Sequence, residues 1–151
     1  MILYYSRLGK TKVIAEVLSE IKSMPIYRLE SDLESKSGFS LMFDILRYSM
    51  FKKPYYVNNM PTELPEEIYI CTPIWDTHIA PPVRHFLQNI SLENIKVHFV
   101  ITPFIPNLRH LTNMEKLLKS LDCIPGQIYT LAVTKESIKD IDTLREHMKG
   151  F

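Results

Sequence analysis

The order of apolar patterns along the chain predicts an α/β protein whose parallel sheet carries helices on both faces. Short apolar runs typical of buried strands alternate with longer segments whose apolar residues recur at helical spacing. Parallel neighbours in a sheet are joined by right-handed, usually helical crossovers, so this alternation favours an open, doubly wound sheet. In such sheets ligands bind outside the carboxyl ends of the strands. We therefore expect a site in the loops at residues 6–11, 72–79 and 102–107.

The first half of the chain supplies two predicted strands and a helix between them. Residues 2–5 form an apolar and aromatic run that suits a strand buried on both faces. From Thr11 to Ile21 the apolar side chains share one helical face and the charged ones the other, which predicts an amphipathic helix. Residues 26–29 follow Pro25 and are predicted to form the second strand.

The second half of the chain repeats this pattern. Three more strands are predicted at residues 68–72, 97–102 and 128–133. Three helices are predicted over residues 81–90, 108–121 and 138–148, the first of them opened by two prolines.

Residues 39–51 are also predicted to be helical, but they fit the alternation least well. Apolar and aromatic side chains cover more than one face of this segment. A well-packed crossover helix accounts for the pattern, and so does a surface that meets a second subunit or shelters a ligand.

Composition narrows the function classes. A chain of 151 residues suits one domain, so we expect residues 1–151 to form a single domain. Its 18 basic and 17 acidic side chains give a net charge of +1, which provides no field to steer the protein to nucleic acid. Cys71 and Cys123 lack the spacing of a zinc site or a disulfide framework, and no other metal-ligand cluster is found. No apolar run reaches the roughly 18 residues of a membrane span, and we expect a cytoplasmic protein.

The short loop before the first predicted helix is a candidate anion site. Gly9-Lys10-Thr11 matches the end of a nucleotide-binding P-loop, but the first glycine of that motif would fall at Tyr4. The dinucleotide pattern GxGxxG also fails, because Gly9 is the only glycine in the region. A tight turn remains, with hydroxyls at Ser6 and Thr11 and the exposed N–H groups of the helix. This combination suits a single terminal phosphate.

Two stretches resemble a known family. One reads Ser6-Arg7-Leu8-Gly9-Lys10-Thr11 and is similar to the phosphate loop of flavodoxins, usually Ser/Thr-x-Thr-Gly-x-Thr. The other reads TPIW at residues 72–75 and APPVRHFL at residues 80–87, and it resembles the TPxW and APPVRxFL signature of many flavodoxin-like proteins. The resemblance implies a flavodoxin-like three-layer α/β/α sandwich with a five-stranded parallel sheet in the order 2-1-3-4-5.

The resemblance also implies FMN as the cofactor, with the phosphate in the first loop and the ring between the second and third loops. The candidate binding residues of the first loop are Ser6, Arg7, Leu8, Gly9, Lys10 and Thr11. Those of the later loops are Thr72, Pro73, Ile74, Trp75, Asp76, Pro103 and Phe104. A flavin stacks well on an indole, although a core-packing role for Trp75 stays open. Arg7 and Lys10 equally suit solvated surface charges.

The chain departs from the family pattern at several positions. Leu8 replaces a threonine, and losing its hydrogen bond to phosphate should cost about 1–3 kcal/mol, which the charge of Lys10 could partly offset. The third loop has no glycine, and its two prolines, Pro103 and Pro106, lack N–H donors for the ring edge. Phe104 could pack against the ring or fill an empty site. Electron-carrier flavodoxins are generally strongly acidic, whereas this chain is nearly neutral, so steering toward basic redox partners should be weak.

Three functions remain open from the sequence. The first is an FMN-binding protein that acts in electron transfer or as a flavin-dependent oxidoreductase, with a redox partner protein or a small-molecule acceptor. The second is a flavodoxin-fold binding or regulatory module that has lost flavin binding. The third is a quinone-reductase-like homodimer in which residues 39–51 help to form the interface. Neither nucleic-acid nor membrane partners are expected, and Ser6 lacks the GxSxG context of a serine hydrolase.

Overall fold

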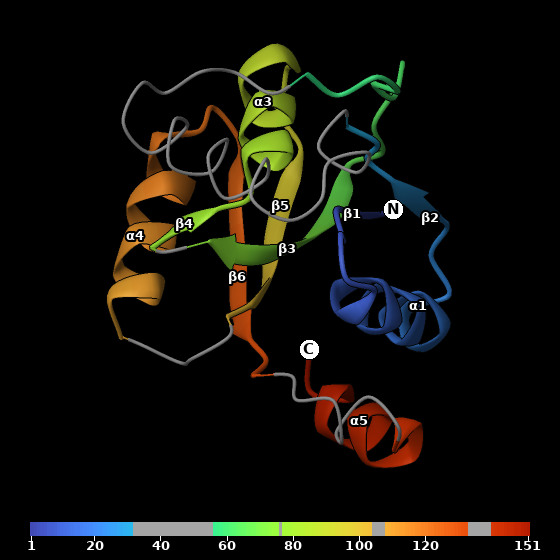
Figure 1. The fold of residues 1–151 in the computed structure, drawn as a ribbon. Helices are drawn as coiled ribbons and strands as arrows, with labels where there is room; N and C mark the ends of the chain where they lie inside the picture. The colour runs from blue at the N-terminus through green and yellow to red at the C-terminus, as the bar shows by residue number, and fades with distance from the viewer. Residues whose placement is uncertain (32–55, 76, 104–107, 133–139) are drawn as a thin grey trace.

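The computed structural model describes residues 1–31, 56–75, 77–103, 108–132 and 140–151 (Figure 1). The parallel strands of its sheet are β1 (Ile2–Tyr4), β2 (Ile26–Arg28), β3 (Glu67–Trp75), β5 (Lys96–Thr102) and β6 (Ile124–Thr130). They lie in the order β2-β1-β3-β5-β6, while the short β4 (His78–Ile79) pairs antiparallel with β3 off this path. Counted without β4, this is the predicted order 2-1-3-4-5.

Helices cover both faces of the sheet. They are α1 (Lys10–Lys22), α3 (Pro81–Asn89), α4 (Leu108–Ser120) and α5 (Ile141–Met148). Side chains alternate between the faces along a strand, and β1 shows this directly. Ile2 and Tyr4 pack with α1 and α5, whereas Leu3 packs with α3 and α4. The sheet is therefore the middle of three layers, as Figure 1 shows.

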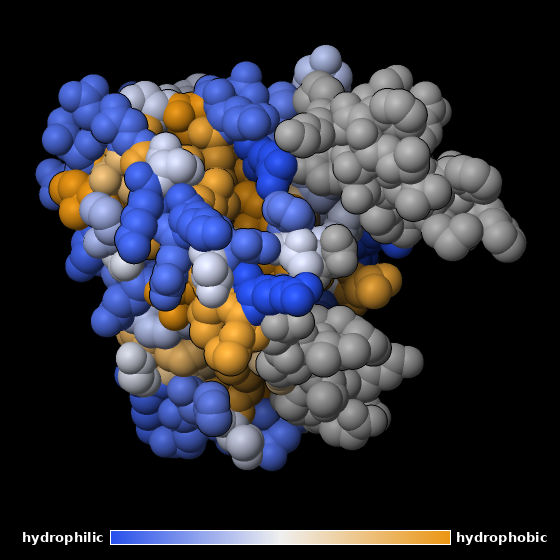
Figure 2. Space-filling view, turned by 90° about the vertical axis from the view of Figure 1, so that its left-hand side faces the viewer, coloured by the Kyte–Doolittle hydropathy of each residue, from blue (hydrophilic) through white to orange (hydrophobic). Residues whose placement is uncertain are grey.

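The amphipathic helices follow from their sequence periodicity. Along α4 the buried side chains are those of His110, Met114 and Leu118, which recur every four residues. Figure 2 views the molecule from the side on which α4 lies, where hydrophilic and hydrophobic residues both show on the coloured part of the face. Among the described helices, none combines the length and apolar content needed to cross a bilayer.

Strand β3 is longer than predicted. We expected a strand over residues 68–72 followed by a loop, but β3 continues to Trp75. Pro73 lies opposite Thr102 of β5, and Trp75 lies opposite His78 of β4. The proline made this segment resemble a loop, yet the chain stays extended because β4 turns back and pairs with its end.

Strand β6 begins earlier than predicted. Its first residue is Ile124, whereas the prediction began at residue 128 because Pro125 and Gly126 look like breakers in the sequence. At the edge of the sheet a proline costs less, since one side of the strand has no neighbour to bond. A Cβ on Gly126 would lie 2.6 Å from the Val97 carbonyl oxygen, so glycine permits the close approach of β6 to β5 there.

The remaining helices begin and end within a few residues of prediction. Helix α5 begins at Ile141, not at residue 138, because the carboxylate of Asp140 accepts a hydrogen bond from the Thr143 N–H at 3.1 Å and caps the helix there. The predicted helix at residues 39–51 lies outside the described residues, as do the candidate residues Asp76 and Phe104.

Candidate functional site

A cavity of about 360 Å3 lies where β1, β3 and β5 end and α1 begins. Its volume falls in the range of roughly 300–1,000 Å3 that is typical of small-molecule sites. The lining residues are Ser6, Arg7, Leu8, Lys10, Thr11, Pro73, Ile74, Trp75, Thr102 and Pro103. All three loops singled out in the sequence therefore contribute to one cavity.

Most of the predicted site residues that the structure describes line this cavity, and two do not. Gly9 is absent from the lining and serves the turn instead. Thr72 is fully buried, and its hydroxyl bonds within the β3 to α3 connection, accepting from the Ala80 N–H at 3.4 Å. Whether the lining residues bind a ligand stays a prediction.

Thr102 lines the cavity but was not among the candidate binding residues, although the expected loop at residues 102–107 begins with it. It is the last residue of β5, so the rule that ligands bind at the carboxyl ends of strands could have identified it. The family resemblance drew attention to the residues after this strand, not to the strand end itself.

The amino end of α1 suits an anion. Gly9 is its N-cap residue, and its φ of 82° lies in the left-handed region that glycine adopts without steric cost. Among the described residues no side chain caps this end, and the first turn contains no acidic residue. The partial positive charge of a helix amino end and its N–H groups attract negative oxygens. Arg7 and Lys10 bring two cationic side chains to the same cavity.

Two threonine hydroxyls, those of Thr11 and Thr102, meet at the wall of the cavity. Thr11 Oγ1 and Thr102 Oγ1 lie 2.9 Å apart, and this contact is buried. The Thr102 hydroxyl is also 3.4 Å from the carbonyl oxygen of Thr72 and donates to it. The side chain at the start of α1 is thus joined to the ends of β5 and β3.

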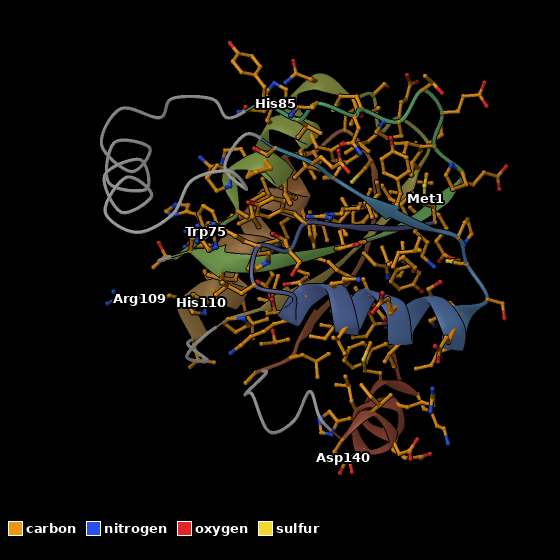
Figure 3. All side chains as sticks on the ribbon, turned by 45° about the vertical axis from the view of Figure 1, so that its right-hand side comes forward. Met1, Trp75, His85, Arg109, His110 and Asp140 are labelled. Carbon is orange, nitrogen blue, oxygen red and sulfur yellow. The ribbon has the colours of Figure 1, made fainter. Side chains whose placement is uncertain are left out.

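Trp75 packs against the core and also lines the cavity, so its stacking on a ligand stays a prediction. Its ring packs partly against the core and meets the fully buried Tyr5 edge to face, with the ring centroids 6.1 Å apart. Trp75 also lines the cavity. Figure 3 shows it on the side of the molecule where α4 begins, marked there by Arg109 and His110. A half-buried indole held from one side can offer another part of its surface to a flat ligand.

Leu8 lines the cavity with a side chain that is 81% exposed. The apolar side chain that replaces the family's threonine therefore extends mainly into solvent. Its main effect on an anion would be the missing hydroxyl, because an exposed side chain excludes little water from the site.

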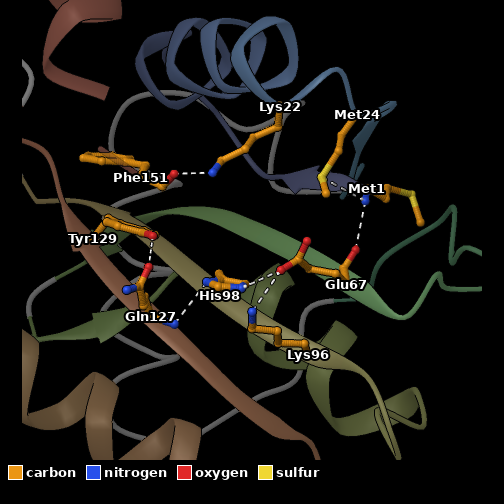
Figure 4. A network of polar contacts seen from close by, with 9 residues as sticks. All are labelled: Met1, Lys22, Met24, Glu67, Lys96, His98, Gln127, Tyr129 and Phe151. Carbon is orange, nitrogen blue, oxygen red and sulfur yellow. Dashed lines mark hydrogen bonds and ion pairs between the residues drawn. The ribbon is translucent and has the colours of Figure 1, made fainter. Parts of the chain in front are cut away.

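A second polar cluster lies near the amino ends of β3 and β5 (Figure 4). His98, 3% exposed, places Nε2 3.1 Å from Glu67 Oε1, while its Nδ1 accepts from the Gln127 N–H at 3.1 Å. These partners require the neutral ring with its hydrogen on Nε2. Lys96 Nζ lies 3.3 Å from the same Glu67 oxygen, and the His98 ring stacks on Tyr69 at a centroid distance of 4.4 Å.

The cluster shifts the titration of its members. Burial lowers the pKa of His98, although the hydrogen bond and charge of Glu67 act in the opposite direction. Burial opposes ionisation of Glu67, but the hydrogen bonds from Lys96 and His98 outweigh it and lower the pKa of Glu67. No signal in the sequence pointed to this cluster, because its members come from three strands.

Comparisons with known proteins identify the fold. No family model matches the chain, and no curated protein gives a significant sequence match. A Bacteroides eggerthii protein provisionally named a flavoprotein superimposes with a TM-score of 0.70 at 18% identity, covering 97% of this chain and 95% of that one. The flavoprotein from Lactobacillus acidophilus in complex with FMN gives 0.66 at 20% identity, with coverages of 92% and 94%.

A third match is the general stress protein 14 of Treponema denticola in complex with FMN, with a TM-score of 0.57, 9% identity and coverages of 97% and 92%. At such identities the likeness concerns the fold. Together with the strand order, it shows that this chain has a flavodoxin-like α/β/α fold carried by a divergent sequence.

Proposed function

We propose that this protein binds FMN and acts in electron transfer or as a flavin-dependent oxidoreductase. The observation that carries the proposal is the cavity at the carboxyl ends of β1, β3 and β5, whose lining combines hydroxyl and cationic groups with an indole. The hydroxyls of Ser6 and Thr11, the cations of Arg7 and Lys10, and the amino end of α1 suit a phosphate. Trp75 lines the same cavity and suits a planar ring.

The donor set fits this cofactor. A phosphate oxygen only accepts hydrogen bonds, and the lining residues named above donate them without a carboxylate among them. When bound, FMN would supply the redox chemistry, which its ring carries. The protein would bind the phosphate, orient the ring against Trp75, and exclude water with Pro73, Ile74 and Pro103. Two of the matched structures, at 20% and 9% identity, were solved with FMN, which supports the assignment.

FMN titration of stripped protein tests the proposal. We expect saturable binding at micromolar concentration or better, which flavin fluorescence and the visible spectrum would detect. Thr11→Ala and Trp75→Ala should weaken uptake, whereas Thr62→Ala, at an exposed position outside the cavity lining, should leave it unchanged. Failure to bind at up to about 1 mM FMN would mean a binding free energy weaker than roughly −4 kcal/mol. It would reject the proposal and favour a binding or regulatory module that has lost flavin binding.

The redox role needs its own measurement. Reduction of the bound flavin by NAD(P)H, followed by turnover with quinones, would favour an oxidoreductase over an electron carrier. Light scattering would test the homodimer, whose proposed interface at residues 39–51 lies outside the described residues. A cytoplasmic location is also part of the proposal, and cell fractionation would test it.

A further inference from the structure

The hydroxyls of Thr11 and Thr102 at the cavity wall have one hydrogen each, which limits how they can bind an anion. A hydroxyl carries one hydrogen and two lone pairs. In the structure Thr102 donates its hydrogen to the Thr72 carbonyl oxygen at 3.4 Å, which can only accept. Either hydroxyl can be the donor in the 2.9 Å contact between Thr11 and Thr102, and when Thr102 donates to Thr72 this contact uses the hydrogen of Thr11.

In that arrangement Thr11 has no hydrogen left for an anion. A phosphate oxygen needs a donor, so Thr11 can bind it only if its own hydrogen turns from Thr102 into the cavity. The 2.9 Å contact then survives only if Thr102 donates to Thr11. The exchange rotates two O–H bonds, keeps the short contact and gives up the longer one of 3.4 Å.

We infer that Thr102 is a positioning residue for the anion end of the cavity. It holds the Thr11 oxygen in place and supplies the hydrogen bond that frees the Thr11 hydrogen for a phosphate oxygen. The inference rests on the proposed function, because FMN is the ligand whose phosphate would occupy this end. Both side chains are almost fully buried, at 2% exposure for Thr11 and 8% for Thr102, so water would compete little for these hydroxyls.

A double-mutant cycle tests how Thr102 acts. The proteins are the unmodified chain, Thr11→Val, Thr102→Val and the double variant, since valine keeps the branched shape of threonine and removes the hydroxyl. FMN and riboflavin affinities are measured for each, because riboflavin lacks the phosphate. The ratio of the two affinities isolates the anion end from effects on the ring.

Thr11→Val should lower the ratio of FMN to riboflavin affinity about 10- to 100-fold, as expected for a hydrogen bond to a charged group. Thr102→Val should lower it about 3- to 10-fold, as expected for a neutral hydrogen bond. The double variant should resemble Thr11→Val alone, because Thr102 acts through Thr11. Thr102→Ser keeps the hydroxyl and should restore most of the ratio, and Thr102→Ala provides a second hydroxyl-free variant if the valine variant does not fold.

An unchanged ratio in the hydroxyl-free Thr102 variants would overturn the inference while leaving FMN binding intact. Additive losses in the double variant would also overturn it, since they would mean that Thr102 contacts the anion directly. If the unmodified chain binds riboflavin and FMN equally or binds neither, the proposed function of the anion end fails and the inference fails with it.

Discussion

Polar side chains at the two ends of the sheet have different surroundings. At the amino ends of β3 and β5, the buried His98 contacts the partly exposed Glu67, which also pairs with the exposed Lys96. At the carboxyl ends, Thr11 and Thr102 form the wall of a cavity of about 360 Å3. A polar cluster closed on itself stabilises a fold, whereas one beside a cavity can exchange its partners with a ligand. The difference favours the carboxyl ends, called the open end below, over the amino ends, called the closed end, as the place for a ligand.

The largest expected effect is a loss of stability from a substitution at the closed end. In Gly126→Ala the added Cβ would lie 2.6 Å from the Val97 carbonyl oxygen, a backbone atom that cannot move aside cheaply. We expect the free energy of unfolding to fall by about 3 kcal/mol in urea denaturation. Gly150→Ala is the matched control, since its Cβ would meet nothing within 4 Å.

This variant also separates the two ends of the sheet. FMN affinity of folded Gly126→Ala should stay within about twofold of the unmodified chain, since distant sites act independently. A large loss of FMN affinity would mean that the ends are coupled and would contradict the comparison.

The next largest effect is a loss of FMN affinity from a substitution at the open end. Trp75→Ala should weaken FMN binding by about 2 kcal/mol, roughly 30-fold, because the ring loses a stacking partner. Fluorescence titration measures the change. Tyr56→Ala serves as a control, because Tyr56 is 62% exposed and lies outside the cavity lining. Equal affinity in the Trp75 variant and the unmodified chain would show that Trp75 belongs to the core alone.

The third effect is a pH dependence of stability that arises at the closed end. The pKa of His98 is lowered by burial, so near pH 6 the unfolded chain binds more protons than the folded one. The stability that His98 contributes is therefore fully present above the unfolded pKa of about 6.5 and is lost as the pH falls below it, by at most about 1.4 kcal/mol per pH unit.

Urea denaturation between pH 7.5 and 3 measures this dependence. His98→Phe keeps a ring to stack on Tyr69 and removes the titrating group, so the part of the slope due to His98 should vanish. Below about pH 4.5 the lowered pKa of Glu67 predicts a further loss, because protonation removes the carboxylate that His98 and Lys96 contact. An unaltered slope in His98→Phe would assign the pH dependence to other groups.

The smallest effect is a gain in FMN affinity from a substitution at the open end. Leu8→Thr restores the hydroxyl that the flavodoxin phosphate loop usually has, and should tighten FMN binding by about 1 kcal/mol or less, at most roughly fivefold. The unfolding free energy should not change, because the Leu8 side chain is 81% exposed. Leu108→Thr is a matched control, since Leu108 is equally exposed at 81% and does not line the cavity. Weaker FMN binding in Leu8→Thr would mean that the leucine itself assists the ligand.

Much of the fold was predictable because burial leaves a periodic record in the sequence. The apolar run before Ser6 and the helical stripe after Thr11 predicted β1 and α1 within one or two residues. Strand ends were harder to predict. Pro73, Pro125 and Gly126 look like breakers, yet pairing with β4 and β5 keeps these segments extended.

The candidate site was predictable as a set of loops and not as a set of contacts. The family resemblance at residues 6–11 and 72–75 identified eight residues that line the cavity, among them all of the first loop except Gly9, and Pro103 of the third loop is the ninth. The contact of Thr102 with Thr11 was not predicted, because nothing in the sequence near Thr102 marks it as a partner of Thr11. His98 was missed for the same reason, since its partners Glu67 and Gln127 lie on neighbouring strands.

The sequence by itself determined which segments are strands and helices, which faces are buried, and which loop offers an anion the amino end of a helix. Those properties depend on residues a few positions apart. Only the tertiary structure decided that the hydroxyls of Thr11 and Thr102, 91 positions apart, meet at 2.9 Å, and that the His98 ring is closed between Glu67 and Gln127. Hydrogen bonds between segments depend on strand register and crossover geometry, which no local pattern records.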